Sequence, residues 1–492
     1  MYYDVNANCK YALKKKARDM QTGLETERKS SISAEDVQAL RSNFRGEILL
    51  PGDKAYDQVR KIWNGMIDRR PVIIARCLGA SDVIKSVKFA KAHSLIVAVR
   101  GGGHNVAGNA VCDGGIMIDL SLMKSVHVDP RSKIARAEPG ATWRQYDIET
   151  QAFGLASTGG LVSSTGLAGF TLGGGIGWLI RKYGLALDSL TSVDVVTANG
   201  DLVTASMSEN TDLFWGVRGG GGNFGIATSF EFKLHPVGPL ILGGLVAFKA
   251  EDGKDVLKFY REFVKDAPDE LTTVAALLTA PPLPVFPQEI QGKHIIAILF
   301  CYCGKIEEGE KLLEPMKKFG KPVVSLISPM PYTVLQTLLD EGAPSGVQNY
   351  WKSSYLTGLS DDLINIVLSF GEKIDSPLSA IHIHQLGGAL QRVGDDATSF
   401  SHRDAPFALN IVSSWTNPEE NAKYIAWTRE FFAAIQRFSK GVYVNFMVED
   451  DASRVKEAYD EGKYAKLVSL KNKYDPQNLF RMNQNIKPSG AS

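Results

Sequence analysis

The sequence contains few cysteines, no long apolar run and almost no net charge. Its five cysteines are an odd number without the spacing of a disulfide framework, which argues against a small disulfide-stabilised fold. No run of 18 apolar residues occurs, so no membrane-spanning helix is expected. The formal net charge is +1, and composition therefore gives no indication of nucleic-acid binding.

The N-terminal stretch offers no targeting signal. "MYYDVNANCKYALKKK" lacks the apolar core of a signal peptide, and the acidic residues that follow are unlike a transit peptide. We therefore expect residues 1–40 to form a polar extension of a cytoplasmic protein. Cys301 and Cys303 form a C-x-C within a strand-like run, and buried thiols are favoured there over a zinc site, so no metal is expected.

Glycine, in contrast, is abundant and clustered. The chain has 47 glycines, and many fall in three clusters, at residues 97–108, 157–190 and 213–234. The first, "VAVRGGGHNVAG", follows an apolar strand, so its backbone N–H groups can approach a phosphate; an ordinary tight turn is equally open. It is not G-x-G-x-x-G, which disfavours a nicotinamide dinucleotide fold. A neutral His104 at its end can serve as a turn residue or as a nucleophile toward a flavin.

Short strands and helices alternate along the first half of the chain. Residues 81–94 have the apolar spacing of a helix with Ser81 as a plausible cap, and residues 141–154 that of a helix ending at Gly154. Asn199-Gly200 between apolar runs predicts a hairpin. Strands are expected at residues 70–76, 95–100, 115–121, 125–129 and 133–140.

The composition changes near residue 238 and again near 440. Prolines cluster after the first boundary, and longer strand-like runs alternate with helices there. The tail forms a helix that stops at "YDP". We expect an α+β protein divided at residues 41–237, 238–440 and 441–492.

Several motifs in order resemble one family. "RGGGHNVAG", "GLAGFTLGGGIGWLIRKYGLALDSL", "LFWGVRGGGGNFGI", "YVNFM" and "KYDPQNLFRMNQNI" resemble the FAD-linked oxidases of the vanillyl-alcohol oxidase superfamily, nearest the berberine-bridge-enzyme-like and hydroxynicotine oxidase branch. The resemblance covers roughly residues 45–490. It implies a two-subdomain FAD-binding domain of the p-cresol methylhydroxylase type (residues 41–237), an antiparallel-sheet substrate domain with flanking helices (238–440), and a C-terminal segment that returns to the FAD domain.

The resemblance also assigns the cofactor site. It implies that His104 bonds covalently to the flavin 8α carbon, with a noncovalent flavin beside His104 as the alternative. Some relatives carry a second link through a cysteine, but that position is Val162 here, so a single bond is expected. The other residues expected to line the FAD are Arg100, Gly101, Gly102, Gly103, Asn105, Gly108, Gly169, Gly174, Gly175, Gly177, Gly225, Ile226 and Asn483.

Three further residues are assigned around the flavin ring. Tyr443 matches the family's catalytic base, although a phenol with a pKa of about 10 needs help to act near pH 7. Gln391 falls where relatives carry glutamine or glutamate. Thr165 lies at the position that controls oxygen access, where a small side chain favours an oxidase. Each also fits a structural role. Two departures from plant members are Ile176 and Ala389, where those enzymes carry tyrosine and lysine.

The implied activity is oxidation of a small molecule. Hydride passes from an alcohol or amine C–H to flavin N5, and O2 reoxidises the flavin to give H2O2. The alternatives are a dehydrogenase with another electron acceptor and a flavin-bound protein with little catalysis. The apolar substitutions hint at an aromatic or alkaloid-like substrate, with no nucleic-acid or membrane partner.

Overall fold

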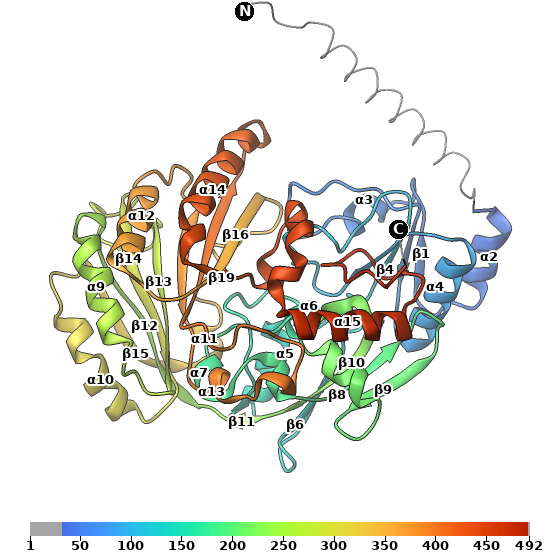
Figure 1. Cartoon of the computed structure of the whole chain (residues 1–492), viewed down its shortest axis with the longest axis horizontal. Helices are drawn as coiled ribbons and strands as arrows, with labels where there is room; N and C mark the ends of the chain where they lie inside the picture. The colour runs from blue at the N-terminus through green and yellow to red at the C-terminus, as the bar shows by residue number, and fades with distance from the viewer. Residues whose placement is uncertain (1–31, 491–492) are drawn as a thin grey trace, which may run out of the picture.

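A computed structural model describes residues 32–490 of the chain, except the side chains of residues 450 and 452. The first 31 residues of the expected N-terminal extension, with Cys9, lie outside the described residues. Helix α2 (Ala34–Ser42) already buries Val37 and Leu40 in an apolar core that also contains Ile73 (the first core), so the packed structure begins before residue 41. Figure 1 shows two parts side by side, with the blue-to-green chain around one group of sheets and the yellow-to-orange chain forming a large sheet.

The first sheet has four strands in the order β1-β2-β4-β3, of which β2, β4 and β3 are parallel. Helix α4 (Ala80–Ala92) packs on this sheet. It starts after Gly79 rather than at the expected Ser81 cap, because the Asp82 carboxylate accepts the N–H groups of Leu78, Arg45 and Gly46. The strands and the short helix after β1 are β1 (Glu47–Leu49), α3 (Tyr56–Val59), β2 (Ile73–Arg76), β3 (Val97–Arg100) and β4 (Ile116–Asp119).

The second sheet has five strands in the order β5-β6-β10-β8-β9. The expected hairpin at Asn199-Gly200 is confirmed between β8 and β9. Helix α5 (Trp143–Gln151) begins with a capping box from Thr142 and Gln145. The remaining elements are β5 (Val126–Asp129), β6 (Ile134–Ala137), β7 (Leu155–Ala156), α6 (Leu167–Leu172), α7 (Ile180–Tyr183), β8 (Leu190–Val196), β9 (Leu202–Ser206), α8 (Thr211–Val217), β10 (Ile226–Lys233) and β11 (His235–Pro236).

The third sheet is antiparallel and has eight strands in the order β15-β12-β14-β13-β17-β18-β16-β19. Helices α9, α10, α12 and α14 bury apolar side chains on its outer face (Figure 1). The elements are β12 (Leu240–Lys249), α9 (Gly253–Phe263), β13 (Leu271–Thr279), β14 (His294–Tyr302), α10 (Ile306–Lys318), β15 (Val324–Pro331), α11 (Tyr332–Leu335), β16 (Gln348–Leu356), α12 (Asp361–Gly371), β17 (Ala380–Gln385), α13 (Ala389–Arg392), β18 (Phe407–Trp415), α14 (Asn421–Ile435) and β19 (Ser439–Gly441).

The C-terminal segment crosses back to the first part of the chain. Helix α15 (Glu461–Tyr474) packs on α8, and Figure 1 shows it among the elements of the first part of the chain. Buried Lys471 donates to Asp475 and to the carbonyls of Asn223 and Phe480, which fixes the tail against the third glycine cluster. In the described residues, no helix is both long and apolar enough to cross a membrane.

A buried carboxyl joins the two parts where α5 meets α11. Asp147 accepts a hydrogen bond of 2.6 Å from the Gln336 amide, and burial raises the pKa of Asp147 to about 7. A raised carboxyl pKa stabilises the fold at low pH, and that stability is lost as pH rises from about 4 to about 7.

We expect Asp147→Asn to flatten this pH dependence, because asparagine carries no proton to lose. Relative to wild type, its stability should rise by up to about 4 kcal/mol between pH 4 and pH 8. Thermal unfolding across this range measures the difference. Asp266→Asn, at an exposed position, should follow the wild-type curve. Parallel curves for Asp147→Asn and wild type would contradict the expectation.

Candidate active site

The first two glycine clusters meet back to back. A Cβ on Gly102 would lie 2.4 Å from the Gly166 Cα, and one on Gly101 would lie 2.8 Å from the Pro139 carbonyl oxygen. Any larger residue would push the loops apart. The loop after β3 is therefore held directly against the start of α6.

His104 ends this loop with its ring held in place. Its imidazole stacks on the Trp63 indole with centroids 4.3 Å apart and planes 18° apart. The Trp63 indole N–H donates to the Ala343 carbonyl at 3.1 Å, and its backbone N–H donates to Gly103 at 3.0 Å. Nε2 of His104 is buried and has no hydrogen-bond partner among the described residues. Burial lowers the pKa of His104 to about 4, so the imidazole is neutral at pH 7.

Other residues of the loop serve its conformation. The Arg100 guanidinium donates to the buried Asp119 carboxylate and to main-chain carbonyls, so its charge is engaged within the protein. The Asn105 side chain accepts the Asn109 N–H, and Gly108, at φ +78°, makes the turn between them. The charge of Arg100 is therefore used within the protein, and the backbone N–H groups of the glycines are the groups expected to meet a phosphate.

The second cluster surrounds the Tyr443 hydroxyl. The hydroxyl oxygen accepts N–H groups from Gly175 at 2.8 Å and Ile176 at 3.4 Å, and the Asn445 amide at 2.8 Å. Gly174 has φ +139°, and a Cβ there would lie 2.9 Å from the Tyr443 ring. Tyr443 precedes a short 3₁₀ turn and is not in a strand.

These three donors favour the phenolate, yet burial outweighs them. The pKa of Tyr443 is raised to about 12 by burial, against the lowering effect of its hydrogen bonds. Tyr443 is 2% exposed. The residue is therefore a protonated phenol near neutral pH.

The third cluster and the tail form an open cradle. Cβ atoms on Gly221 and Gly222 would meet nothing within 4 Å, and the same holds for Gly169 of α6. Asn483 donates to Gly222 and Phe480, but its Oδ1 is buried without a partner in the described chain. Accessible glycine backbone beside an unused amide oxygen suits a dinucleotide.

Gly177, Gly225 and Ile226 were expected to line the FAD, but the structure packs them against other parts of the protein. A Cβ on Gly177 would lie 1.6 Å from the Gly159 oxygen, and one on Gly225 would lie 2.4 Å from Val195. Ile226 starts β10 and is buried in the first core.

The chain matches two family models, one in its first half and one near its C-terminus. An FAD binding domain matches residues 71–206, and a berberine and berberine-like segment matches residues 442–487. An FAD-linked oxidoreductase of Dictyostelium discoideum is 34% identical over 452 residues, covering 91% of this chain and 95% of the relative. The chain belongs to the berberine-bridge-enzyme-like FAD-linked oxidoreductases. The expected family, fold class and FAD cofactor are confirmed.

Further relatives support this family. (R)-6-hydroxynicotine oxidase of Paenarthrobacter nicotinovorans is 30% identical over 469 residues, covering 91% of this chain and 98% of the relative. A crystal structure of 6-hydroxy-D-nicotine oxidase from Arthrobacter nicotinovorans has a TM-score of 0.83 at 30% identity, covering 91% of this chain and 98% of the other. Physcomitrella patens BBE-like 1 shares the fold, with a TM-score of 0.82 at 23% identity and coverage of 93% and 99%.

Gln391 is not placed with Tyr443. It lies on α13, is exposed, and donates to the Asp404 carbonyl at 3.3 Å. It lines a surface cavity of about 650 Å³ with Arg181, Arg261 and Lys265. Ala389 is the first residue of α13. This placement gives no support to a catalytic role for Gln391.

Thr165 lies within the contact between the first two clusters. Its carbonyl carbon would lie 3.8 Å from a Cβ on Gly102, and its side chain is partly buried.

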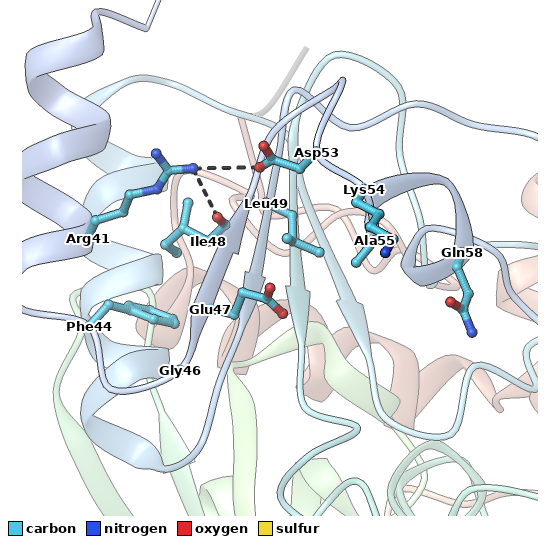
Figure 2. A pocket seen from close by; sticks show the side chains of 10 residues that line it. All are labelled: Arg41, Phe44, Gly46, Glu47, Ile48, Leu49, Asp53, Lys54, Ala55 and Gln58. Atoms are coloured by element: carbon cyan, nitrogen blue, oxygen red, sulfur yellow. Dashed lines mark hydrogen bonds and ion pairs between the residues drawn. The ribbon is translucent and has the colours of Figure 1, made fainter.

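A larger cavity of about 780 Å³ lies elsewhere, beside the edge strand β1. Figure 2 shows Arg41 reaching across it to Asp53 and the Ile48 carbonyl, and it contains none of the expected site residues.

Sequence reasoning missed polar residues of the large sheet that face the site. His384 of β17 lies 5.9 Å from the Phe446 ring, which in turn is 4.9 Å from Tyr443. Asn410 of β18 lies on the same face, opposite His382. The available signal was alternation: "AIHIHQ" places His382 and His384, and "FALNIV" places Asn410, on one face of a buried strand.

Proposed function

We propose that the chain is an oxidase that holds FAD through one covalent bond to His104 and oxidises an alcohol or amine C–H of a small molecule, with O2 as the electron acceptor and H2O2 as the product. The observation that carries the proposal is His104 itself. A neutral imidazole, stacked on Trp63 and with Nε2 unengaged, is a competent nucleophile at a fixed position.

The second covalent link of some relatives, through a cysteine, cannot form here because that position is Val162. The described part of the second cluster contains no cysteine, and the four described cysteines are Cys77, Cys112, Cys301 and Cys303. Burial raises the pKa of each of these thiols, which disfavours the reactive thiolate. A single bond through His104 is the consistent arrangement.

Bound FAD supplies a two-electron acceptor for the hydride that leaves the substrate carbon. Within the protein, the minor phenolate fraction of Tyr443 takes the substrate's O–H or N–H proton, and this fraction grows as pH rises toward the pKa of about 12. The N–H groups of Gly175, Ile176 and Asn445 hold the charge of that form. The aromatic rings around Tyr443 exclude water from the reacting atoms.

Reoxidation by O2 tests the choice between oxidase and dehydrogenase. We expect the reduced wild-type protein to be reoxidised rapidly by O2 in stopped-flow absorbance. Thr165→Leu should slow that step about tenfold or more, equivalent to about 1.4 kcal/mol on the barrier, because the larger side chain narrows access to the flavin. Thr191→Leu, on β8, should leave the step unchanged.

Slow wild-type reoxidation with fast reduction of an artificial acceptor would instead establish a dehydrogenase. An intact, reducible flavin that no alcohol or amine reduces would favour the protein with little catalysis.

A further inference from the structure

On one face of the large sheet, side chains from three neighbouring strands lie in two adjacent rows. Strand register places Ser353, Asn410 and His382 directly opposite one another on β16, β18 and β17. The next row along contains Tyr355, Ala408 and His384. Directly opposed residues of antiparallel strands project to the same face.

This face looks onto the site built around Tyr443 and His104. The Tyr355 ring lies 6.4 Å from Tyr443. Trp351, which precedes Ser353 on the same face, lies 5.6 Å from Trp63, the residue stacked on His104. The Phe446 ring lies 5.9 Å from both Trp351 and His384. One continuous set of rings therefore joins the sheet face to the flavin site.

The polar atoms on this face are buried and unused. Among the described residues, no partner exists for either ring nitrogen of His384, for Oδ1 of Asn410, or for the hydroxyls of Ser353 and Tyr355. The Trp351 indole N–H is in the same state. Buried polar atoms without partners are rare and destabilising, so six in one place indicate a surface made to bind something.

The chemistry of the surface is neutral. Its two rows, with Trp351 and the neighbouring Val274 and Ala276 of β13, contain no acidic or basic side chain other than the histidines. Burial lowers the pKa of His384 to about 3 and that of His382 to about 4, so both are uncharged at pH 7. A charged ligand would lose its hydration here without gaining a counter-charge.

The neutral groups also define what is bound. A neutral imidazole offers one donor and one acceptor, and Asn410 offers an acceptor. These match hydroxyl and carbonyl groups. Trp351, Tyr355 and Phe446 supply flat apolar walls, and Ala408 leaves room between Tyr355 and His384.

The large sheet belongs to the substrate domain that the family resemblance implies. Within it, we propose that His384 and Asn410 are specificity-determining residues, and that they select an uncharged aromatic or conjugated-ring molecule bearing hydroxyl or carbonyl groups. The proposal rests on the proposed oxidase function, since it places the substrate between this face and the flavin.

Binding to the oxidised holoenzyme tests the proposal without turnover. Ligands are titrated while the flavin absorbance is recorded. The panel contains neutral hydroxylated aromatics (phenol, catechol, 2-naphthol, 7-hydroxycoumarin), their charged counterparts (benzoate, benzylammonium, 2-naphthoate) and the disaccharide cellobiose. We expect the tightest binding among the neutral aromatics. Tighter binding of the charged compounds or of cellobiose, or no binding of any neutral aromatic, would overturn the proposal.

Variants then locate the contacts. His384→Phe and, separately, Asn410→Leu should each weaken the best neutral ligand about 10- to 100-fold, the usual effect of losing a hydrogen bond to a buried polar group. Ser354→Ala is the matched control, because Ser354 is equally buried on β16 of the same sheet but points to the opposite face. Unchanged affinity in both variants, with flavin content and melting temperature retained, would refute the assignment. His384→Gln should recover part of the affinity and keeps the test valid if phenylalanine impairs folding.

These outcomes are separable from failure of the oxidase itself. A protein that binds neutral aromatics but whose flavin is dissociable or inert toward O2 would contradict the proposed function and leave the roles of His384 and Asn410 intact.

Discussion

In the His104→Ala variant, we expect all of the flavin to be released when the protein is denatured in acid, whereas the wild-type flavin stays with the chain. Alanine has no nucleophilic nitrogen, and no described cysteine lies near enough in sequence to Val162 to replace it. The measurement is the flavin absorbance of the precipitated protein, together with the mass of the intact chain. The expected change is complete, from one flavin per chain to none.

His127→Ala is a suitable control for this experiment, because His127 is exposed on β5 and should leave attachment unchanged. Release of flavin from the wild-type protein would refute the covalent bond. The FAD cofactor itself would stand in that case, because it rests on the family.

The second large effect is expected from Tyr443→Phe. Removing the hydroxyl should lower kcat/KM by about 10²- to 10⁴-fold, the usual contribution of a general base, while flavin content is retained. Steady-state kinetics with any substrate that reduces the wild-type flavin measures the loss. Tyr424→Phe, on the outer helix α14, should retain full activity.

The pH profile distinguishes a base from a structural tyrosine. Because burial raises the pKa of Tyr443 to about 12, the phenolate fraction should increase with pH throughout the neutral range. We expect wild-type kcat/KM to rise with pH without a plateau below the pKa of about 12, and the Tyr443→Phe profile to be flat. A wild-type plateau near neutral pH would show that another group takes the proton.

The glycine clusters show what kind of feature can be predicted from the sequence, while their contact with FAD stays a prediction. Gly101, Gly102 and Gly174 stand where two segments approach too closely for any side chain, or where φ is positive. Such demands are local and leave a direct mark in the sequence. His104 was predicted as a cofactor residue because it ends the glycine run that follows β3.

In the large sheet, by contrast, local sequence does not reveal which side chains come together. Gln391 was chosen by position along the chain, yet α13 exposes it at the surface. His384 and Asn410 lie on two strands that hydrogen-bond to each other although they are 26 positions apart in the sequence (410 − 384). Nothing local in either strand states which partner it has or which face is turned toward Tyr443.

The sequence by itself therefore determined the family and the FAD cofactor, because the motifs that carry the resemblance are local stretches in a fixed order along the chain. The roles assigned to individual residues stay predictions. The tertiary structure alone decided what stands opposite the flavin site. Strand register brought His382, His384, Asn410 and Ser353 onto one face, and burial kept the histidines neutral. Both depend on contacts between distant segments, which no single stretch of the chain encodes.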